Sequence, residues 1–192
     1  MKTIELEING KQVVANEGDT ILEAAIKNGI HIPTLCHNSK VKPSGVCRLC
    51  MVEIRKKEKE RKRIVASCVY PVEEDLVVET ETDKIKKIRS MIVELLWPSL
   101  PELAREYGIT KSRFYPKQTD CNLCGLCVRY CSEVMKKNTV YFKGRGVNRE
   151  VSLVPDMMNE CAYCRECFYL CTGGRIVEQC DNYYQSLSSH SQ

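Results

Sequence analysis

The chain is poor in aromatic side chains and contains no long apolar run. Aromatic residues make up 7% of its 192 residues, and the hydrophobic fraction of 43% lies slightly below the globular average. This small apolar supply predicts small modules that are held together by something besides core burial. No run of about 18 or more apolar residues exists, so the sequence predicts no membrane span.

The sequence also lacks the motifs expected of a nucleotide or substrate site. No Walker motif, no G-x-G-x-x-G and no pairing of a histidine with a nucleophile is visible. Gly144-Arg145-Gly146 is too short for a phosphate-binding loop and predicts a turn instead. The alternating, charged stretch 1–7 has no apolar region of the kind a signal peptide needs. We therefore expect no catalytic residues in this chain, and a cytoplasmic location.

The charge is mild and unevenly distributed. The net charge is +4, and the basic residues concentrate between Arg55 and Arg63, in the stretch RKKEKERKR. A solvated hairpin tip explains this stretch better than a nucleic-acid surface, because no aromatic residues interleave with it for base stacking. We expect no nucleic-acid partner. A zinc-binding, nucleic-acid-associated module is the alternative.

Cysteine, by contrast, is abundant. The chain has 13 cysteines. In a reducing compartment, patterned cysteines indicate metal binding rather than disulfides. Twelve of them form three groups of four: Cys36, Cys47, Cys50 and Cys68; Cys121, Cys124, Cys127 and Cys131; Cys161, Cys164, Cys167 and Cys171. Cys180 is left over, and we expect it to be an ordinary buried or free thiol.

The second and third groups share the spacing C-x2-C-x2-C-x3-C, which is typical of cubane [4Fe–4S] sites. The pattern resembles two-cluster ferredoxins, in which the fourth cysteine of each run ligates the other cluster. This resemblance assigns the two ligand sets as Cys121, Cys124, Cys127 and Cys171, and as Cys131, Cys161, Cys164 and Cys167. The proline that usually follows the fourth cysteine is replaced by Ser132 and Thr172, which removes no ligand. Two zinc sites are the alternative, but zinc prefers C-x2-C pairs separated by a longer loop.

The first group has the spacing C-x10-C-x2-C-x17-C, which is related to the plant-type [2Fe–2S] loop but has a longer excursion after Cys36. Ser44-Gly45 allows the backbone to approach a cluster closely and to donate N–H groups to its sulfurs. A structural zinc is the alternative here. His37 adjoins Cys36 and could ligate iron, but four cysteines already suffice.

The fold class that we predict is α+β. Residues 1–80 predict a β-grasp module: Asn9-Gly10 marks a type I′ hairpin, and Asp19 or Thr20 caps a helix that closes at Asn28-Gly29. The later strands of this module are predicted at 51–55, 63–68 and 76–80.

The rest of the chain predicts a connector, a second module and a tail. Residues 81–116 contain no cysteine and predict a helical connector, with Thr82 as a cap and Trp97-Pro98 as a stop. Residues 117–180 predict a two-[4Fe–4S] ferredoxin domain with short strands at 139–142 and 151–154. Residues 181–192 predict a flexible tail.

Several motifs resemble one known family. Ile32-Pro33-Thr34-Leu35-Cys36 and Gly45-Val46-Cys47-Arg48-Leu49-Cys50-Met51-Val52-Glu53 are similar to the N-terminal [2Fe–2S] module of the large iron–sulfur subunit of respiratory complex I. The same module occurs in NAD-linked and electron-bifurcating hydrogenases and in NAD-dependent formate dehydrogenases. The resemblance continues through 103–108, 121–129 and 141–146, and covers nearly the whole chain.

The resemblance implies an iron–sulfur electron-transfer subunit of a cytoplasmic, flavin-containing, NAD(P)-linked oxidoreductase complex, and among such complexes we favour a hydrogenase or electron-bifurcating complex. It implies one [2Fe–2S] cluster and two [4Fe–4S] clusters in this chain, with FMN and NAD(P) on a partner subunit. A hydrogenase or another catalytic subunit, or a soluble ferredoxin, would exchange electrons with the cubanes. A formate dehydrogenase subunit, a bifurcating transhydrogenase subunit and a free diffusible ferredoxin are the alternatives.

Two departures from the family bear on this expectation. Family members commonly carry an additional [4Fe–4S] cluster held by one histidine and three cysteines. The matching stretch here, 95–99, contains neither residue type, so we expect that cluster to be absent. The chain also has no catalytic domain after Cys171, which predicts a stand-alone wiring subunit.

Overall fold

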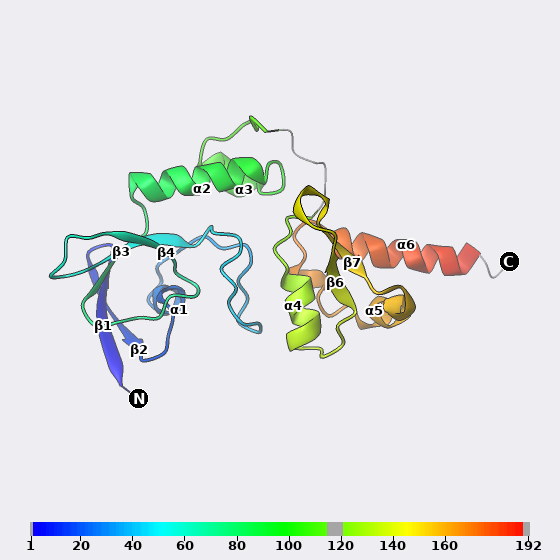
Figure 1. Ribbon diagram of the computed structural model, residues 1–192, viewed down its shortest axis with the longest axis horizontal. Helices are drawn as coiled ribbons and strands as arrows, with labels where there is room; N and C mark the ends of the chain where they lie inside the picture. The colour runs from blue at the N-terminus through cyan, green and yellow to red at the C-terminus, as the bar shows by residue number, and fades with distance from the viewer. Residues whose placement is uncertain (1, 115–120, 190–192) are drawn as a thin grey trace. The chain divides into compact units, whose positions relative to one another are not determined.

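The computed structural model describes residues 2–114 and 121–189, and it combines helices with strands as the sequence predicts (Figure 1). The chain divides into two compact units. One contains Met1–His37 and Pro43–Phe114, and the other contains Asn38–Lys42 and Tyr115–Gln192. The predicted end of the connector at 116 and the predicted start of the ferredoxin domain at 117 lie outside the described residues.

The first unit is built on a five-stranded sheet with the strand order β2-β1-β5-β3-β4. β1 and β5 are parallel, whereas β1–β2, β3–β4 and β3–β5 are antiparallel. The strands are β1 (Thr3–Ile8), β2 (Lys11–Asn16), β3 (Met51–Lys56), β4 (Arg63–Ala66) and β5 (Leu76–Glu79), and helix α1 (Ile21–Lys27) follows β2. A hairpin, a helix and then strands returning to the sheet form the order that the sequence predicts.

Local signals explain the start of this unit. Asn9 and Gly10 have φ values of 52° and 76°, which a two-residue type I′ turn requires. Ile4, Leu6 and Ile8 alternate with exposed or half-exposed residues and enter the core. Thr20 caps α1 in a capping box with Glu23, which satisfies backbone N–H groups at the helix start.

The predicted connector is part of the first unit. It contains α2 (Asp83–Leu95), capped by Thr82, and α3 (Pro101–Glu106), which begins at its proline. Val93 and Ala104 from these helices form a small buried cluster with Leu49, and the half-buried Cys47 packs against it. The two helices therefore support the stretch that carries two cysteines of the first group.

The second unit has a two-stranded antiparallel sheet with helices packed around it. Its elements are β6 (Val140–Lys143), β7 (Glu150–Leu153), α4 (Leu126–Glu133), α5 (Met158–Cys164) and α6 (Arg175–Ser189), with 3-10 turns at Gly146–Asn148, Pro155–Met157 and Phe168–Leu170. The predicted strands are present and are joined through the turn at Gly144–Gly146.

Residues 181–189 of the predicted flexible tail continue helix α6, and 190–192 lie outside the described residues. Ile176 and Cys180 anchor its first turns in the core. Extending an existing helix costs far less than starting one, so an anchored helix can continue through polar residues.

Candidate iron–sulfur sites

The four cysteines of the first group come from two loops and converge within the first unit. Cys36 precedes the excursion that ends at Cys47, Cys50 immediately precedes β3, and Cys68 follows β4. The antiparallel pairing of β3 with β4 places Met51 opposite Ala66 and so brings Cys50 close to Cys68. Their Sγ atoms lie 3.3 Å apart. Cys36, Cys50 and Cys68 are each 1% exposed.

These thiols interact as two pairs. A hydrogen bond from Cys47 lowers the pKa of Cys36 to about 5, against the opposing effect of burial. A hydrogen bond from Cys68 lowers the pKa of Cys50 to about 6 in the same way. The Cys36 thiolate in turn raises the pKa of Cys68, after the larger contributions of Cys50 and burial. Two thiol pairs that lie close enough for one to shift the pKa of the other suit a two-iron cluster, in which each iron takes two thiolates.

The backbone donors expected around Ser44-Gly45 are present. Gly45 has a φ of 63°, and its N–H donates to the Cys68 sulfur. The N–H of Val46 donates to Cys36, and the Ser44 hydroxyl lies 3.8 Å from the same sulfur. Such donors stabilise the negative charge that thiolate ligands carry.

In the structure, Cys171 of the third group lies near the cysteines of the second group. Burial raises the pKa of Cys127, and the charges of Cys167, Cys124, Cys171 and Cys121 add to that effect. Burial likewise raises the pKa of Cys121, with Cys171 as the nearby negative charge. The side-chain amide of Asn122 also donates to the Thr172 hydroxyl at 3.3 Å, so Cys171 lies near the second group, although 40 or more residues separate it from them in the sequence.

The remaining cysteines surround a small cavity in the second unit. The residues that line the cavity include Cys131, Cys161, Cys164 and Cys167, together with Thr139, the residue before β6. Burial raises the pKa of Cys167 to about 12, and the charges of Cys161, Cys131 and Cys164 contribute. Cys131, which belongs to the second group in the sequence, therefore lies with the cysteines of the third group.

The cavity has features that fit a cluster. The Thr139 backbone N–H donates to the Cys131 sulfur at 3.3 Å. The Thr139 hydroxyl is buried and has no hydrogen-bond partner, although it lines the cavity, so it is free to donate to a cluster sulfur. Within the described ranges, no three His, Cys, Asp or Glu side chains are placed to hold a single metal ion. Buried thiols with backbone and hydroxyl donors beside them are the kind of ligand set that an iron–sulfur cluster takes.

Two residues near these sites escaped the sequence patterns. Arg89 of α2 is fully buried, and its guanidinium donates to the carbonyls of Leu49 and Met51 at 2.9 Å, one on each side of Cys50. Its position one helical turn from Ile85 and Val93 was the available signal, because it places an arginine on the apolar face. Cys180 is the second, with its Sγ 3.5 Å from that of Cys161.

The Cys180 thiol also affects its neighbour electrostatically. Its hydrogen bond is the main cause that lowers the pKa of Cys161, against the effect of burial. His37, which adjoins Cys36, has a buried Nδ1 without a hydrogen-bond partner.

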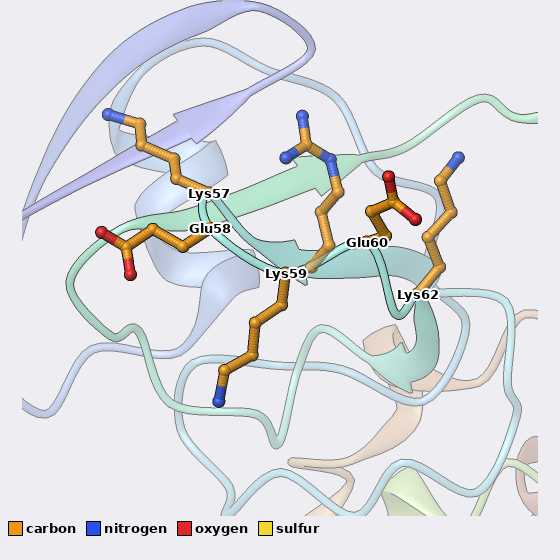
Figure 2. A pocket seen from close by; sticks show the side chains of 6 residues that line it. Lys57, Glu58, Lys59, Glu60 and Lys62 are labelled. Atoms are coloured by element: carbon orange, nitrogen blue, oxygen red, sulfur yellow. The ribbon is translucent and has the colours of Figure 1, made fainter.

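The basic stretch forms the turn between β3 and β4. A hollow of about 380 Å³ there is lined by Arg55, Lys57, Glu58, Lys59, Glu60 and Lys62. Figure 2 shows that these side chains fan out in different directions and do not converge on one point. Lys62 is paired with Glu53 at 3.0 Å. This arrangement fits the predicted solvated hairpin tip rather than a built anion site.

Comparison with known proteins shows what the chain is related to. Residues 1–83 match the family of 2Fe-2S iron-sulfur cluster binding domains. The NADPH-Fe(3+) oxidoreductase subunit alpha of Geobacter sulfurreducens is 28% identical over 92% of this chain and 24% of its own length. The NADH-ubiquinone oxidoreductase 75 kDa subunit of Dictyostelium discoideum is 32% identical over 77% of this chain and 25% of its own length.

A solved structure is also similar. A chain of an NAD+-reducing [NiFe]-hydrogenase in the H2-reduced state matches with a TM-score of 0.68 and 27% identity, over 79% of this chain and 75% of that chain. By contrast, this chain spans about a quarter of the length of the curated relatives above. In the part of the chain that the structure describes, no helix is both long and apolar enough to cross a membrane.

Proposed function

We propose that the chain is an electron-transfer subunit of an NAD(P)-linked oxidoreductase complex. Residues 1–83 match the family of 2Fe-2S iron-sulfur cluster binding domains, and the chain is similar to subunits of NADPH- and NADH-linked oxidoreductases, which supports this proposal. Cys36, Cys47, Cys50 and Cys68 would hold a [2Fe–2S] cluster. Two [4Fe–4S] clusters would be held by the mixed sets Cys121, Cys124, Cys127, Cys171 and Cys131, Cys161, Cys164, Cys167.

The observation that carries this proposal is the crossing of the two cysteine runs. Cys171 lies with the second group, and Cys131 lines the same cavity as Cys161, Cys164 and Cys167. Zinc sites built from separate C-x2-C pairs have no reason to cross in this way. When bound, iron–sulfur clusters accept and release single electrons at potentials set by their surroundings.

The protein residues would supply the environment of each cluster. Burial of the ligands excludes water, and the N–H groups of Gly45, Leu123 and Thr139 donate to ligand sulfurs. The charge of Cys167 contributes to raising the pKa of Cys127, so the two cubane ligand sets are close neighbours. Such proximity supports electron transfer between them.

Among the possible complexes we favour an NAD(P)-linked hydrogenase. The similarity to a chain of the NAD+-reducing [NiFe]-hydrogenase, with a TM-score of 0.68 and 27% identity over 79% of this chain, supports this choice. A partner subunit would carry FMN and NAD(P), and a hydrogenase subunit or a soluble ferredoxin would exchange electrons with the cubanes. A cytoplasmic location would keep the thiolates reduced.

The experiment that tests the proposal is anaerobic purification of the chain with its native partners. We expect about ten irons per chain, from one [2Fe–2S] and two [4Fe–4S] clusters. The matched variant Cys68→Ala should lower the count to about eight. Hydrogen-dependent reduction of NAD(P) by the co-purified complex would support the hydrogenase assignment. A colourless, zinc-containing protein would refute the electron-transfer role, and formate-dependent reduction would redirect the assignment of the complex.

A further inference from the structure

The thirteenth cysteine lies against one proposed cluster ligand. Cys180 in α6 is fully buried, and its Sγ is 3.5 Å from the Sγ of Cys161 in α5. Among the described residues, the lining of the cysteine cavity includes Cys161 but not Cys180. Cys180 therefore contacts the ligand from outside the cavity, where it can donate a hydrogen bond but cannot replace the ligand without a rearrangement.

Contacts on both sides hold this thiol in place. Ile176, one helical turn before it, is fully buried. Gln179 donates to the backbone carbonyl of Val151 in β7 at 3.3 Å. The guanidinium of Arg165, at the end of α5, lies 3.5 Å from the carboxylate of Asp181. Because α6 is fixed to both α5 and β7, the separation between the two sulfurs is a built feature of the core.

The two cubane sites differ in this respect. All other cysteines of the chain belong to the three groups of four, so no additional thiol is left to stand behind the site of Cys121, Cys124 and Cys127. The ligand Cys121 instead accepts the backbone N–H of Leu123 at 3.4 Å. Hydrogen-bond donation to a ligand sulfur favours the reduced cluster, because that state carries more negative charge on its sulfurs.

We propose that Cys180 is a positioning residue that tunes one redox centre. Its S–H donates to the Cys161 sulfur and raises the reduction potential of the cluster held by Cys131, Cys161, Cys164 and Cys167. The proposal rests on the electron-transfer function proposed above. The consequence is an inequality between two otherwise similar clusters, which makes this cluster the preferred resting place of an electron in the second unit.

The test compares Cys180→Ala with Cys180→Ser in the anaerobically purified full chain. Redox titration followed by electron paramagnetic resonance measures each cluster separately. In Cys180→Ala we expect the ratio of reduced to oxidised cluster at a fixed potential to fall about threefold, a shift of about 28 mV for one electron. Cys180→Ser keeps a donor and should restore most of the wild-type value. The signal of the neighbouring cluster should not move.

Further measurements separate the possible failures. Cys180→Val fills the space without a donor, and it replaces Cys180→Ala if alanine leaves the core too loose to fold. An unchanged potential in a fully loaded alanine or valine variant would overturn the proposal and leave Cys180 as a core residue. Loss of about four irons from the serine variant would also overturn it, by making Cys180 a ligand. If the wild-type chain itself carries no cubane, the proposed function fails instead.

Discussion

Arg89 shows how a single side chain can organise a ligand loop. Its two hydrogen bonds to the carbonyls of Leu49 and Met51 satisfy backbone groups on both sides of Cys50, while Glu81 balances its charge at 2.5 Å. Burying an arginine costs free energy unless its guanidinium is fully paired. The hydrogen bonds to the backbone around Cys50 therefore explain why an arginine is stable at this position.

Replacing this arginine should weaken the first site. We expect Arg89→Met to lower the free energy of unfolding by about 3 kcal/mol, because two buried carbonyls lose their donor. Visible circular dichroism of the [2Fe–2S] cluster should weaken in parallel. Lys86→Met, on the exposed side of α2, is the control and should change stability by less than about 0.5 kcal/mol. Equal behaviour of the two variants would contradict the role given to Arg89.

The crossing of the cysteine runs is also tested at the level of one residue. Cys164 lies in the third group under any assignment, so Cys164→Ala defines the resonance signal of that cluster. We expect Cys131→Ala to abolish the same signal and to remove about four irons, because Cys131 lines the same cavity. If Cys131→Ala instead abolished the signal lost in Cys124→Ala, each run would bind its own cluster.

At the scale of elements, the turn between β6 and β7 has one glycine that cannot be replaced cheaply. Gly144 and Gly146 both have positive φ, at 71° and 55°. A Cβ on Gly144 would lie 2.3 Å from the backbone oxygen of Asn148, whereas a Cβ on Gly146 would meet nothing within 4 Å.

These two glycines form a matched pair of variants. We expect Gly146→Ala to cost about 1 kcal/mol, from the left-handed backbone alone. Gly144→Ala should cost about 3 kcal/mol, because the clash with backbone atoms adds to the same conformational cost. Chemical unfolding of the intact chain measures both values. Similar costs would show that the turn relaxes freely and that the steric argument is wrong.

The end of α2 depends on a carboxylate. Glu94 accepts hydrogen bonds from the backbone N–H, Nε and Nη2 of Arg113, each at 2.8 Å. These bonds from Arg113 lower the pKa of Glu94 from 4.5 to about 2. A carboxyl group whose pKa is lower in the folded state stabilises the fold. This stabilisation is complete at pH values above its unfolded-state pKa and is lost as the pH falls through its folded-state pKa.

We therefore expect a pH-dependent difference between wild type and Glu94→Gln. The difference in unfolding midpoint should be full at pH 7 and should shrink between pH 4.5 and about 2. The single tryptophan, Trp97, packs beside α2, so its fluorescence reports on this region. Acid also affects the clusters, but it does so in both proteins, so the difference isolates Glu94. A difference that stays constant with pH would contradict the assignment.

Local signals made part of this fold predictable from sequence. The Asn9-Gly10 turn, the caps at Thr20 and Thr82, and the strands after Cys50 and before Cys68 all depend on neighbours in the chain, and the structure contains them. The helices α4, α5 and α6 carry weaker local signals. They form because tertiary packing around the cysteines supports them, which a pattern of one residue type does not reveal.

The candidate sites were predictable to a similar degree. Spacing alone grouped the cysteines, because ligands to one cluster must lie on tight loops. Spacing could not show that Arg89 supports Cys50 or that Cys180 contacts Cys161, since both contacts join elements that are far apart in sequence. The sequence also did not predict where the excursion after Cys36 lies. Asn38–Lys42 belongs to the second unit, and Val41 is buried in the core of that unit.

At the scale of the whole molecule, the two units differ in what fills their cores. Among the described residues, the main core cluster of the first unit has two cysteines, Cys50 and Cys68, among many aliphatic side chains. The core cluster of the second unit includes the buried Cys127, Cys131, Cys161, Cys167 and Cys180. The second unit therefore depends more on its ligand residues for stability.

Removing the clusters should affect the units unequally. After anaerobic chelation of iron, we expect hydrogen exchange to accelerate across 121–180, because the proposed clusters would contribute folding free energy there. The strands β1, β2 and β5 should keep their protection, since their core is mainly aliphatic. Reconstitution with iron and sulfide should restore the protection of the second unit. Loss of protection in the sheet first would contradict this order.

The crossed cysteines also constrain when the protein can mature on the ribosome. The thiols of the first site are all synthesised once Cys68 has emerged, whereas each mixed set needs residues from both runs, and one of them needs Cys171. At about 5–20 residues per second, the roughly hundred intervening residues take about 5–20 s to translate. Under the proposed ligand sets, the first cluster could be inserted into a nascent chain once Cys68 has emerged, whereas the other two would wait for Cys167 and Cys171. Polypeptides released early would carry the small cluster alone.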